Sequence, residues 1–229
     1  MERTNKTLVC LANSRKHSAR CVAGIVDGGS GEWIRPVGDR PKHEVSERER
    51  RYPDGTEPNV LDVVSVSLLR PQPYRFQTEN WLLDPDCRWR RTGRIGWSEL
   101  LMLEQRPDTL WINGSHTFHG TNDCVPTEKT VALRDSLKLI RVTDLTLRVN
   151  TPRARFGDPS KALSACFSHA GYPYILRVTD PTYEQKYLIR PEGTHKLGES
   201  FLTISLGEPF GDHSYKLVAA IIERARIQV

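Results

Sequence analysis

The feature that most constrains the fold is a series of short apolar runs separated by turn residues in the C-terminal part of the chain. The run at residues 137–149 is rich in Leu, Ile and Val, and the loop 150–160 follows it. Such runs favour strands, whereas Gly, Pro, Asn and Asp between them favour turns. Further runs of this kind follow at residues 162–167, 174–178, 200–206 and 216–222. Five strands in so short a segment predict a small β-barrel over residues 131–229.

The N-terminal part opens with a similar pattern. Apolar runs at residues 8–12, 20–26 and 33–37 predict a β-meander. Residues 27–32 join the last two runs and have the glycine-rich composition of a hairpin turn. Residues 60–69 predict a further strand, because they are rich in β-branched side chains.

Two segments interrupt the strands of the first half. Residues 38–58 are highly charged, and although Ser46 has the position of an N-cap for a short helix at 47–51, the charge favours a solvated loop. Residues 95–104 place apolar side chains at helical intervals and predict a helix. We therefore expect a mainly β protein in which residues 1–130 form a barrel decorated with loops and a short helix.

Composition narrows the class of protein. The chain has 229 residues, of which 38% are hydrophobic and 27% charged, and its formal net charge is +5. These values are typical of globular proteins, and the basic bias favours polyanionic partners. No apolar run reaches the length of a membrane span, and the first residues lack the apolar core of a secretory signal. We expect a cytoplasmic protein without a membrane partner.

The cysteines and histidines give no pattern typical of a metal site. Cys10, Cys21 and Cys166 lie within apolar runs, where a reduced cysteine behaves as a small hydrophobic residue. We predict that these are buried free thiols rather than nucleophiles. His116 and His119 are three residues apart, but no third ligand lies at a typical spacing. We expect neither a metal nor a cofactor.

Catalytic residues remain unassigned. Ser14, Asp180 and His213 contain the side chains of a hydrolytic triad, but no nucleophile-elbow motif surrounds the serine. Asp180 is followed by Pro181, a pair that favours the start of a turn. Residues 28–31 are glycine-rich but fit a hairpin turn better than a phosphate-binding loop. These observations favour a non-catalytic protein.

Arginine and lysine residues interleaved with aromatic side chains form three groups that suit nucleic acid. Cations neutralise phosphates, and an exposed aromatic ring can stack on a base. The alternative is that Trp33 and Trp89 belong to the core while the cations are ordinary solvated or ion-paired surface. The groups are Arg15, Lys16 and Arg20 with Trp33 and Arg35; Arg88, Arg90, Arg91 and Arg94 around Trp89; and Arg148, Arg153 and Arg155 before Phe156.

Several segments carry a resemblance to a known family. They are residues 11–16 (LANSRK), 20–24 (RCVAG), 33–37 (WIRPV), 205–210 (SLGEPF) and 215–220 (YKLVAA). With them the chain resembles the dual OB-containing domain family of bacterial proteins over almost its whole length. The resemblance implies two OB-like barrels and an association with prokaryotic conflict and nucleic-acid systems, and it supplies no active site.

OB-like barrels often bind oligonucleotides, and the basic groups agree with such a ligand. We therefore predict a non-catalytic module that binds nucleic acid, with single-stranded DNA or RNA favoured over duplex. One alternative is an adaptor that binds other proteins of the same system through strand edges and the 95–104 helix. An enzyme with an unrecognised active site is a third. Salt dependence separates the first two, because phosphate binding weakens steeply as salt rises.

Overall fold

The computed structural model describes residues 3–16, 19–28, 31–152 and 158–227. The chain divides into two compact units, Met1–Leu103 with Arg134–Ser136, and Glu104–Leu133 with Leu137–Val229. This division groups residues 104–133 with the second unit, whereas the sequence predicts the boundary between residues 130 and 131. That boundary stays a proposal.

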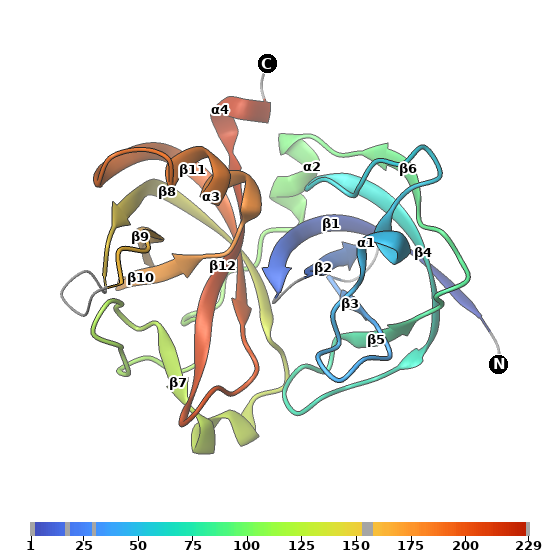
Figure 1. Ribbon diagram of the computed structural model, residues 1–229, viewed down its shortest axis with the longest axis horizontal. Helices are drawn as coiled ribbons and strands as arrows, with labels where there is room; N and C mark the ends of the chain where they lie inside the picture. The colour runs from blue at the N-terminus through green and yellow to red at the C-terminus, as the bar shows by residue number, and fades with distance from the viewer. Residues whose placement is uncertain (1–2, 17–18, 29–30, 153–157, 228–229) are drawn as a thin grey trace. The chain divides into compact units, whose positions relative to one another are not determined.

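The first unit is a closed five-stranded barrel. Its strands follow the order β1-β2-β3-β5-β4, and β4 also pairs with β1, which closes the ring. The pairing of β3 with β5 is parallel, whereas the other pairs of the ring are antiparallel. A sixth strand, β6, pairs only with β4 (Figure 1). The bounds are β1 Thr4–Lys16, β2 Ala19–Val26, β3 Trp33–Val37, β4 Asp62–Pro71, β5 Asn80–Leu83 and β6 Arg90–Arg94.

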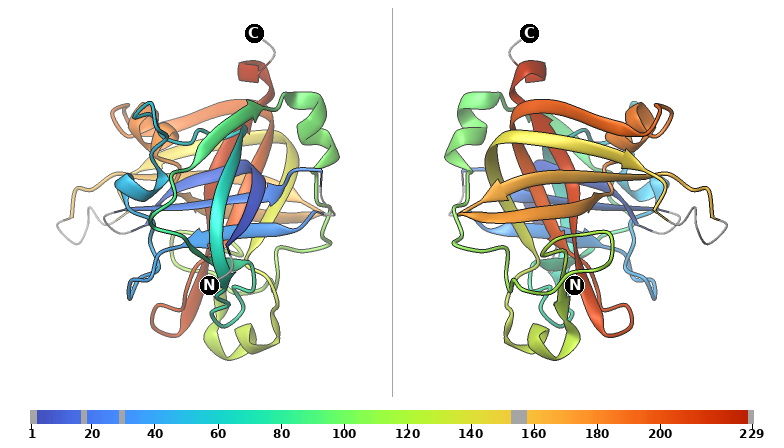
Figure 2. Two further views of the ribbon diagram at one scale, coloured as in Figure 1. Left: turned by 90° about the vertical axis from the view of Figure 1, so that its right-hand side faces the viewer. Right: turned by 90° about the vertical axis from the view of Figure 1, so that its left-hand side faces the viewer.

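The second unit repeats this topology. Its ring has the order β8-β9-β10-β12-β11, and β11 returns to β8 (Figure 2). The parallel pair is β10 with β12, and it has only two residue pairs, Arg177 with Leu217 and Val178 with Val218. The predicted mainly β fold with two OB-like barrels is confirmed. The bounds are β7 Cys124–Pro126, β8 Leu137–Asn150, β9 Ala162–His169, β10 Tyr172–Val178, β11 Gly193–Leu206 and β12 His213–Glu223.

Each barrel encloses its own apolar core. Successive side chains of a strand point to opposite faces, so alternate residues of these strands turn inward. Leu145, Leu147 and Val149 of β8 are buried in this way, and the residues between them are half-buried. The first core includes Leu8, Ile34, Leu68 and Trp89, and the second includes Leu147, Leu176 and Val218.

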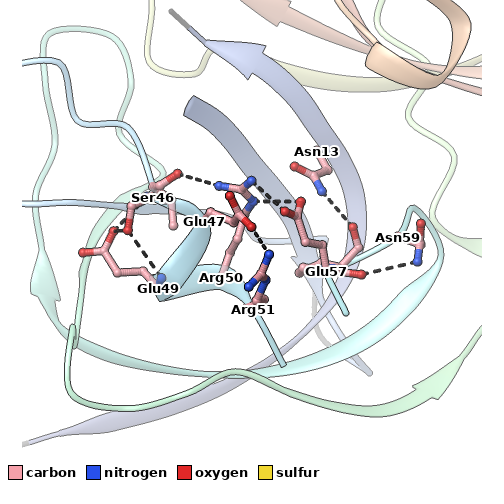
Figure 3. Close-up of polar contacts among 10 residues, drawn as sticks. Asn13, Ser46, Glu47, Glu49, Arg50, Arg51, Glu57 and Asn59 are labelled. Carbon is pink, nitrogen blue, oxygen red and sulfur yellow. Dashed lines mark hydrogen bonds and ion pairs between the residues drawn. The ribbon is translucent and has the colours of Figure 1, made fainter. Parts of the chain in front are cut away.

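The helices are short. Contrary to the expected solvated loop, residues 47–50 form α1 (Glu47–Arg50), because Ser46 and Glu49 make a reciprocal capping box. The Arg50 guanidinium then holds the following loop by donating to the Glu57 carboxylate at 2.9 and 3.0 Å (Figure 3). The helix expected at 95–104 is present as α2 (Trp97–Met102). The others are η1 (Thr127–Ala132), α3 (Pro181–Tyr187) and α4 (Arg224–Ile227).

The cysteines are less buried than expected. All five cysteines are free, but of the three expected in the core only Cys10 is buried, whereas Cys21 and Cys166 are half-buried. Cys21 and Cys166 each lie at a strand position that faces away from the apolar centre, which a run of apolar residues in the sequence does not reveal.

Among the described residues, no helix has the length and apolar character needed to cross a membrane.

Candidate nucleic-acid interface

Arg35 is part of the interior of the first unit and does not face a ligand. Its guanidinium is 3% exposed and lies 3.1 Å from a carboxylate oxygen of Glu79. It also donates to Asn80 Oδ1 at 3.2 Å and to Ser136 Oγ at 2.9 Å. Trp33 is buried as well, so the predicted pairing of an exposed ring with a phosphate-binding arginine is wrong. Every residue of β3 is buried, which explains both failures.

The cations beside the first hairpin remain candidates. Arg15 is exposed and Arg20 is half-buried, and the two are paired across β1 and β2. Their backbones therefore place them side by side at the end of the hairpin. Lys16 ends β1, and its side chain lies outside the described part of the structure. A role of this hairpin in binding stays a prediction.

In the second group the cations are exposed, but the tryptophan ring is buried. Trp89 is 1% exposed and belongs to the core of the first unit, so its predicted role as a stacking platform is wrong. The tryptophan lies just before β6, where an inward position satisfies its large apolar surface. Arg94 forms an ion pair of 2.7 Å with buried Asp62. The other three cations, Arg88, Arg90 and Arg91, are exposed.

The third group is only partly described. Arg148 is half-buried, and its Nη2 lies 3.5 Å from the backbone oxygen of His119. Arg153 and Arg155 fall outside the described residues, as does Phe156. Arg148 therefore lies against the segment that carries His119. This segment lines a pocket that the sequence did not predict.

A pocket of about 550 Å³ is lined by strands two and three of the second barrel. Ala162 and Ser164 come from β9, and Ile175 and Arg177 come from β10. This face, together with the loops that join strands one to two and four to five, is where OB barrels bind oligonucleotides. Both loops contribute here. Pro152, Asp158, Ser160 and Lys161 come from the first loop, and Phe210 comes from the second.

One wall of this pocket is the segment 117–123, which the backbone attaches to β10. Thr121 and Ile175 exchange two backbone hydrogen bonds of 3.1 and 3.2 Å. The carboxylate of Asp123 accepts from the backbone N–H and the hydroxyl of Thr117, at 2.8 and 2.6 Å. A side chain at Gly120 would collide with that carboxylate, so glycine fits this close approach. The wall is therefore held in a defined position.

Two phenylalanine rings are exposed on the segments that surround the pocket. Phe210 lines it and is 79% exposed, and Phe118 is 77% exposed on the wall segment. The Phe118 ring meets the His119 ring edge-on, with 4.9 Å between centroids. An exposed aromatic ring is a platform on which any base can stack.

Polar groups of the pocket can contact a phosphate and a base edge. Arg177 is exposed, and Lys161 is half-buried with its ammonium 2.6 Å from the backbone oxygen of Arg190. The Oδ1 atom of Asn150 is buried without a hydrogen-bond partner among the described residues. A buried acceptor of this kind calls for a donor, which a bound ligand can supply.

The pocket residues were missed because their signal is weak in a sequence. Phe210 lies in Gly207-Glu208-Pro209-Phe210-Gly211-Asp212, a run with turn composition, and an aromatic residue within a turn is more exposed than one within a strand. That pattern could have identified it. In the sequence, Arg177 and Lys161 have no neighbouring cations. Only the fold brings them to the same pocket.

The side chains considered for catalysis come from different units. Ser14 belongs to the first unit, whereas Asp180 and His213 belong to the second. Asp180 accepts hydrogen bonds from the backbone N–H groups of Thr182 and Ile221 and caps α3, so it starts a short helix where a turn was expected. Burial raises the pKa of the Cys10 thiol to about 12, which disfavours a thiolate nucleophile. No cluster of metal-ligating side chains occurs among the described residues.

Comparison with known proteins gives one match. No curated protein and no solved structure is similar enough to the chain to count as a match. The family model of the dual OB-containing domain matches residues 6–221, which span both barrels. The chain therefore belongs to the dual OB-containing domain family.

Proposed function

We propose that the protein binds single-stranded nucleic acid in the pocket of its second barrel. The observation that carries this proposal is the position of Phe210, an exposed ring at a pocket that also holds Arg177 and Lys161. A base stacks on the ring while the cations contact the adjacent phosphates. Duplex DNA keeps its bases stacked on each other, so this arrangement favours single strands.

The contrast between the two barrels supports the choice of the second. Strand three of the first barrel, β3, is buried along its whole length. Strand three of the second barrel, β10, alternates between buried and exposed residues in its C-terminal part, with Tyr174, Leu176 and Val178 inward and Arg177 outward. Only the second barrel therefore offers side chains of this strand to a ligand.

The test is a fluorescence anisotropy titration with labelled single-stranded DNA, single-stranded RNA and duplex at two salt concentrations. Phe210→Ala should weaken single-strand binding by about 1–3 kcal/mol and leave the salt dependence unchanged. Arg177→Ala should reduce the magnitude of the salt slope by about 0.7. Ile189→Ala is the matched control, since Ile189 is also a large exposed apolar residue of the second unit but does not line the pocket.

Two results would contradict the proposal. The first is wild-type protein that retains neither DNA nor RNA at low salt. The second is an equal loss of affinity in Phe210→Ala and Ile189→Ala, which would mean that the pocket ring has no special role. The adaptor and enzyme alternatives stay predictions, and a partner interface would show little salt dependence.

A further inference from the structure

We propose that the first barrel carries a second nucleobase-stacking site, formed by His43, Tyr74 and Arg75. The site does not use β3, which is buried along its whole length, but two loops at the surface of that barrel. His43 lies in the loop after β3, and Tyr74 and Arg75 lie in the loop between β4 and β5. The inference takes its ligand class, single-stranded nucleic acid, from the proposed function.

The three side chains form one cluster. The His43 and Tyr74 rings have centroids 5.6 Å apart and are tilted by 46°. The Arg75 guanidinium lies 5.6 Å from the centroid of the Tyr74 ring. Tyr74 remains 38% exposed in spite of both neighbours, and Arg75 is exposed. An open ring beside a cation suits a base and its phosphate.

Both loops are built to hold these residues. Tyr74 and Gln77 exchange two backbone hydrogen bonds of 2.9 and 3.2 Å, which closes a tight turn around Arg75. The His43 N–H donates to the Arg40 oxygen at 2.9 Å. The guanidinium of Arg40 in turn donates to both carboxylate oxygens of Glu49 at 2.8 Å. Glu49 is the residue that completes the capping box with Ser46 (Figure 3).

Two residues of the cluster have a left-handed backbone. His43 has φ 56° and Arg75 has φ 54°, a left-handed conformation that side chains other than glycine seldom adopt. Strain of this kind persists where the surroundings enforce it, and it gathers at binding sites. Here it occurs at two residues, from two loops, that contact the same exposed ring.

The stacking role of Tyr74 can be tested by a pair of variants. Tyr74→Ala should weaken binding of a labelled single strand by about 5-fold or more, whereas Tyr74→Phe keeps the ring and should bind like the wild type. Tyr172→Ala is the matched control, because Tyr172 is a 45% exposed tyrosine that lies outside both sites. Thermal unfolding of each variant checks that the fold is intact.

A second readout locates the base directly. An oligonucleotide that contains 5-iodouracil is bound and irradiated, and the crosslinked residue is identified by mass spectrometry. We expect adducts at Tyr74 as well as in the pocket of the second barrel, and we expect Phe210→Ala to leave the Tyr74 adduct in place. Arg75→Ala should lower the magnitude of the salt slope by about 0.7, while Arg48→Ala, an exposed cation of α1, should not.

The outcomes separate this inference from the proposed function. Suppose that Phe210→Ala binds more weakly than the wild type, whereas Tyr74→Ala has the same affinity and the same crosslinked adducts as the wild type. The second site is then refuted and the pocket stands. If Tyr74→Ala loses affinity while Tyr74→Phe and Phe210→Ala bind like the wild type, the second site stands and the pocket proposal fails. If Tyr74→Phe loses as much affinity as Tyr74→Ala, stacking is refuted.

Discussion

Replacing Arg35 by Met should destabilise the first barrel without changing how nucleic acid binding depends on salt. The substitution removes an ion pair of 3.1 Å to Glu79 and two hydrogen bonds, and it leaves a carboxylate that is only 5% exposed without its cation. Breaking a buried pair in this way costs about 3–5 kcal/mol, a large part of the stability of an ordinary domain. A phosphate-binding arginine would instead show a reduced salt slope and nearly normal stability.

The assay is urea unfolding of four proteins: wild type, Arg35→Met, Glu79→Gln and the double variant Arg35→Met/Glu79→Gln. Each single variant leaves one buried charge unpaired, whereas the double variant leaves none, so it should lose less stability than the sum of the singles. Ser136 also donates to Glu79 and should soften the loss in Arg35→Met. A loss below about 1 kcal/mol in both singles, or strict additivity, would refute the reasoning.

Three further outcomes follow from buried groups. Trp89→Ala should lower the free energy of unfolding by about 3–5 kcal/mol, measured by thermal melting, because it empties part of the first core. Gly24→Ala should weaken the β1–β2 pair, seen as faster amide exchange, since its Cβ would lie 2.2 Å from the Val9 oxygen. Burial lowers the pKa of Lys216 from 10.5 to about 8, so the unfolded chain holds that proton more tightly. The unfolding free energy of the wild type should therefore rise by about 3 kcal/mol relative to Lys216→Met between pH 8 and 10.5.

Most barrel strands could be predicted from sequence because they carry their own local signal, whereas β5 (Asn80–Leu83), a strand of the first ring, was not predicted. The β-branched residues of β4 and the apolar runs of the second half mark strands wherever they fold. β6 has only a weak signal of this kind, because its residues are all exposed and four of the five are Arg or Gly. It becomes a strand by pairing with β4, which is a tertiary effect.

The candidate site was harder to predict, because exposure is decided by the whole fold. Arg35 and Arg177 both lie on strand three of a barrel, yet the first is buried against Glu79 and the second is exposed. Their neighbours in sequence do not distinguish them. The motif Trp-x-Arg at 33–35 predicts a shared strand face correctly but cannot show that both faces of that strand are buried.

The short parallel pair between β10 and β12 has a consequence for motion. The β10–β12 pairing has two residue pairs, followed by a Thr179 N–H to Val218 oxygen bond of 2.9 Å, whereas β8 and β11 are paired along most of their length. Local opening should therefore begin at this seam, where the fewest hydrogen bonds must break. Since β10 also carries Ile175 and Arg177 of the pocket, each opening changes the width of the pocket, and a nucleic acid bound there, as proposed, would slow amide exchange along β10.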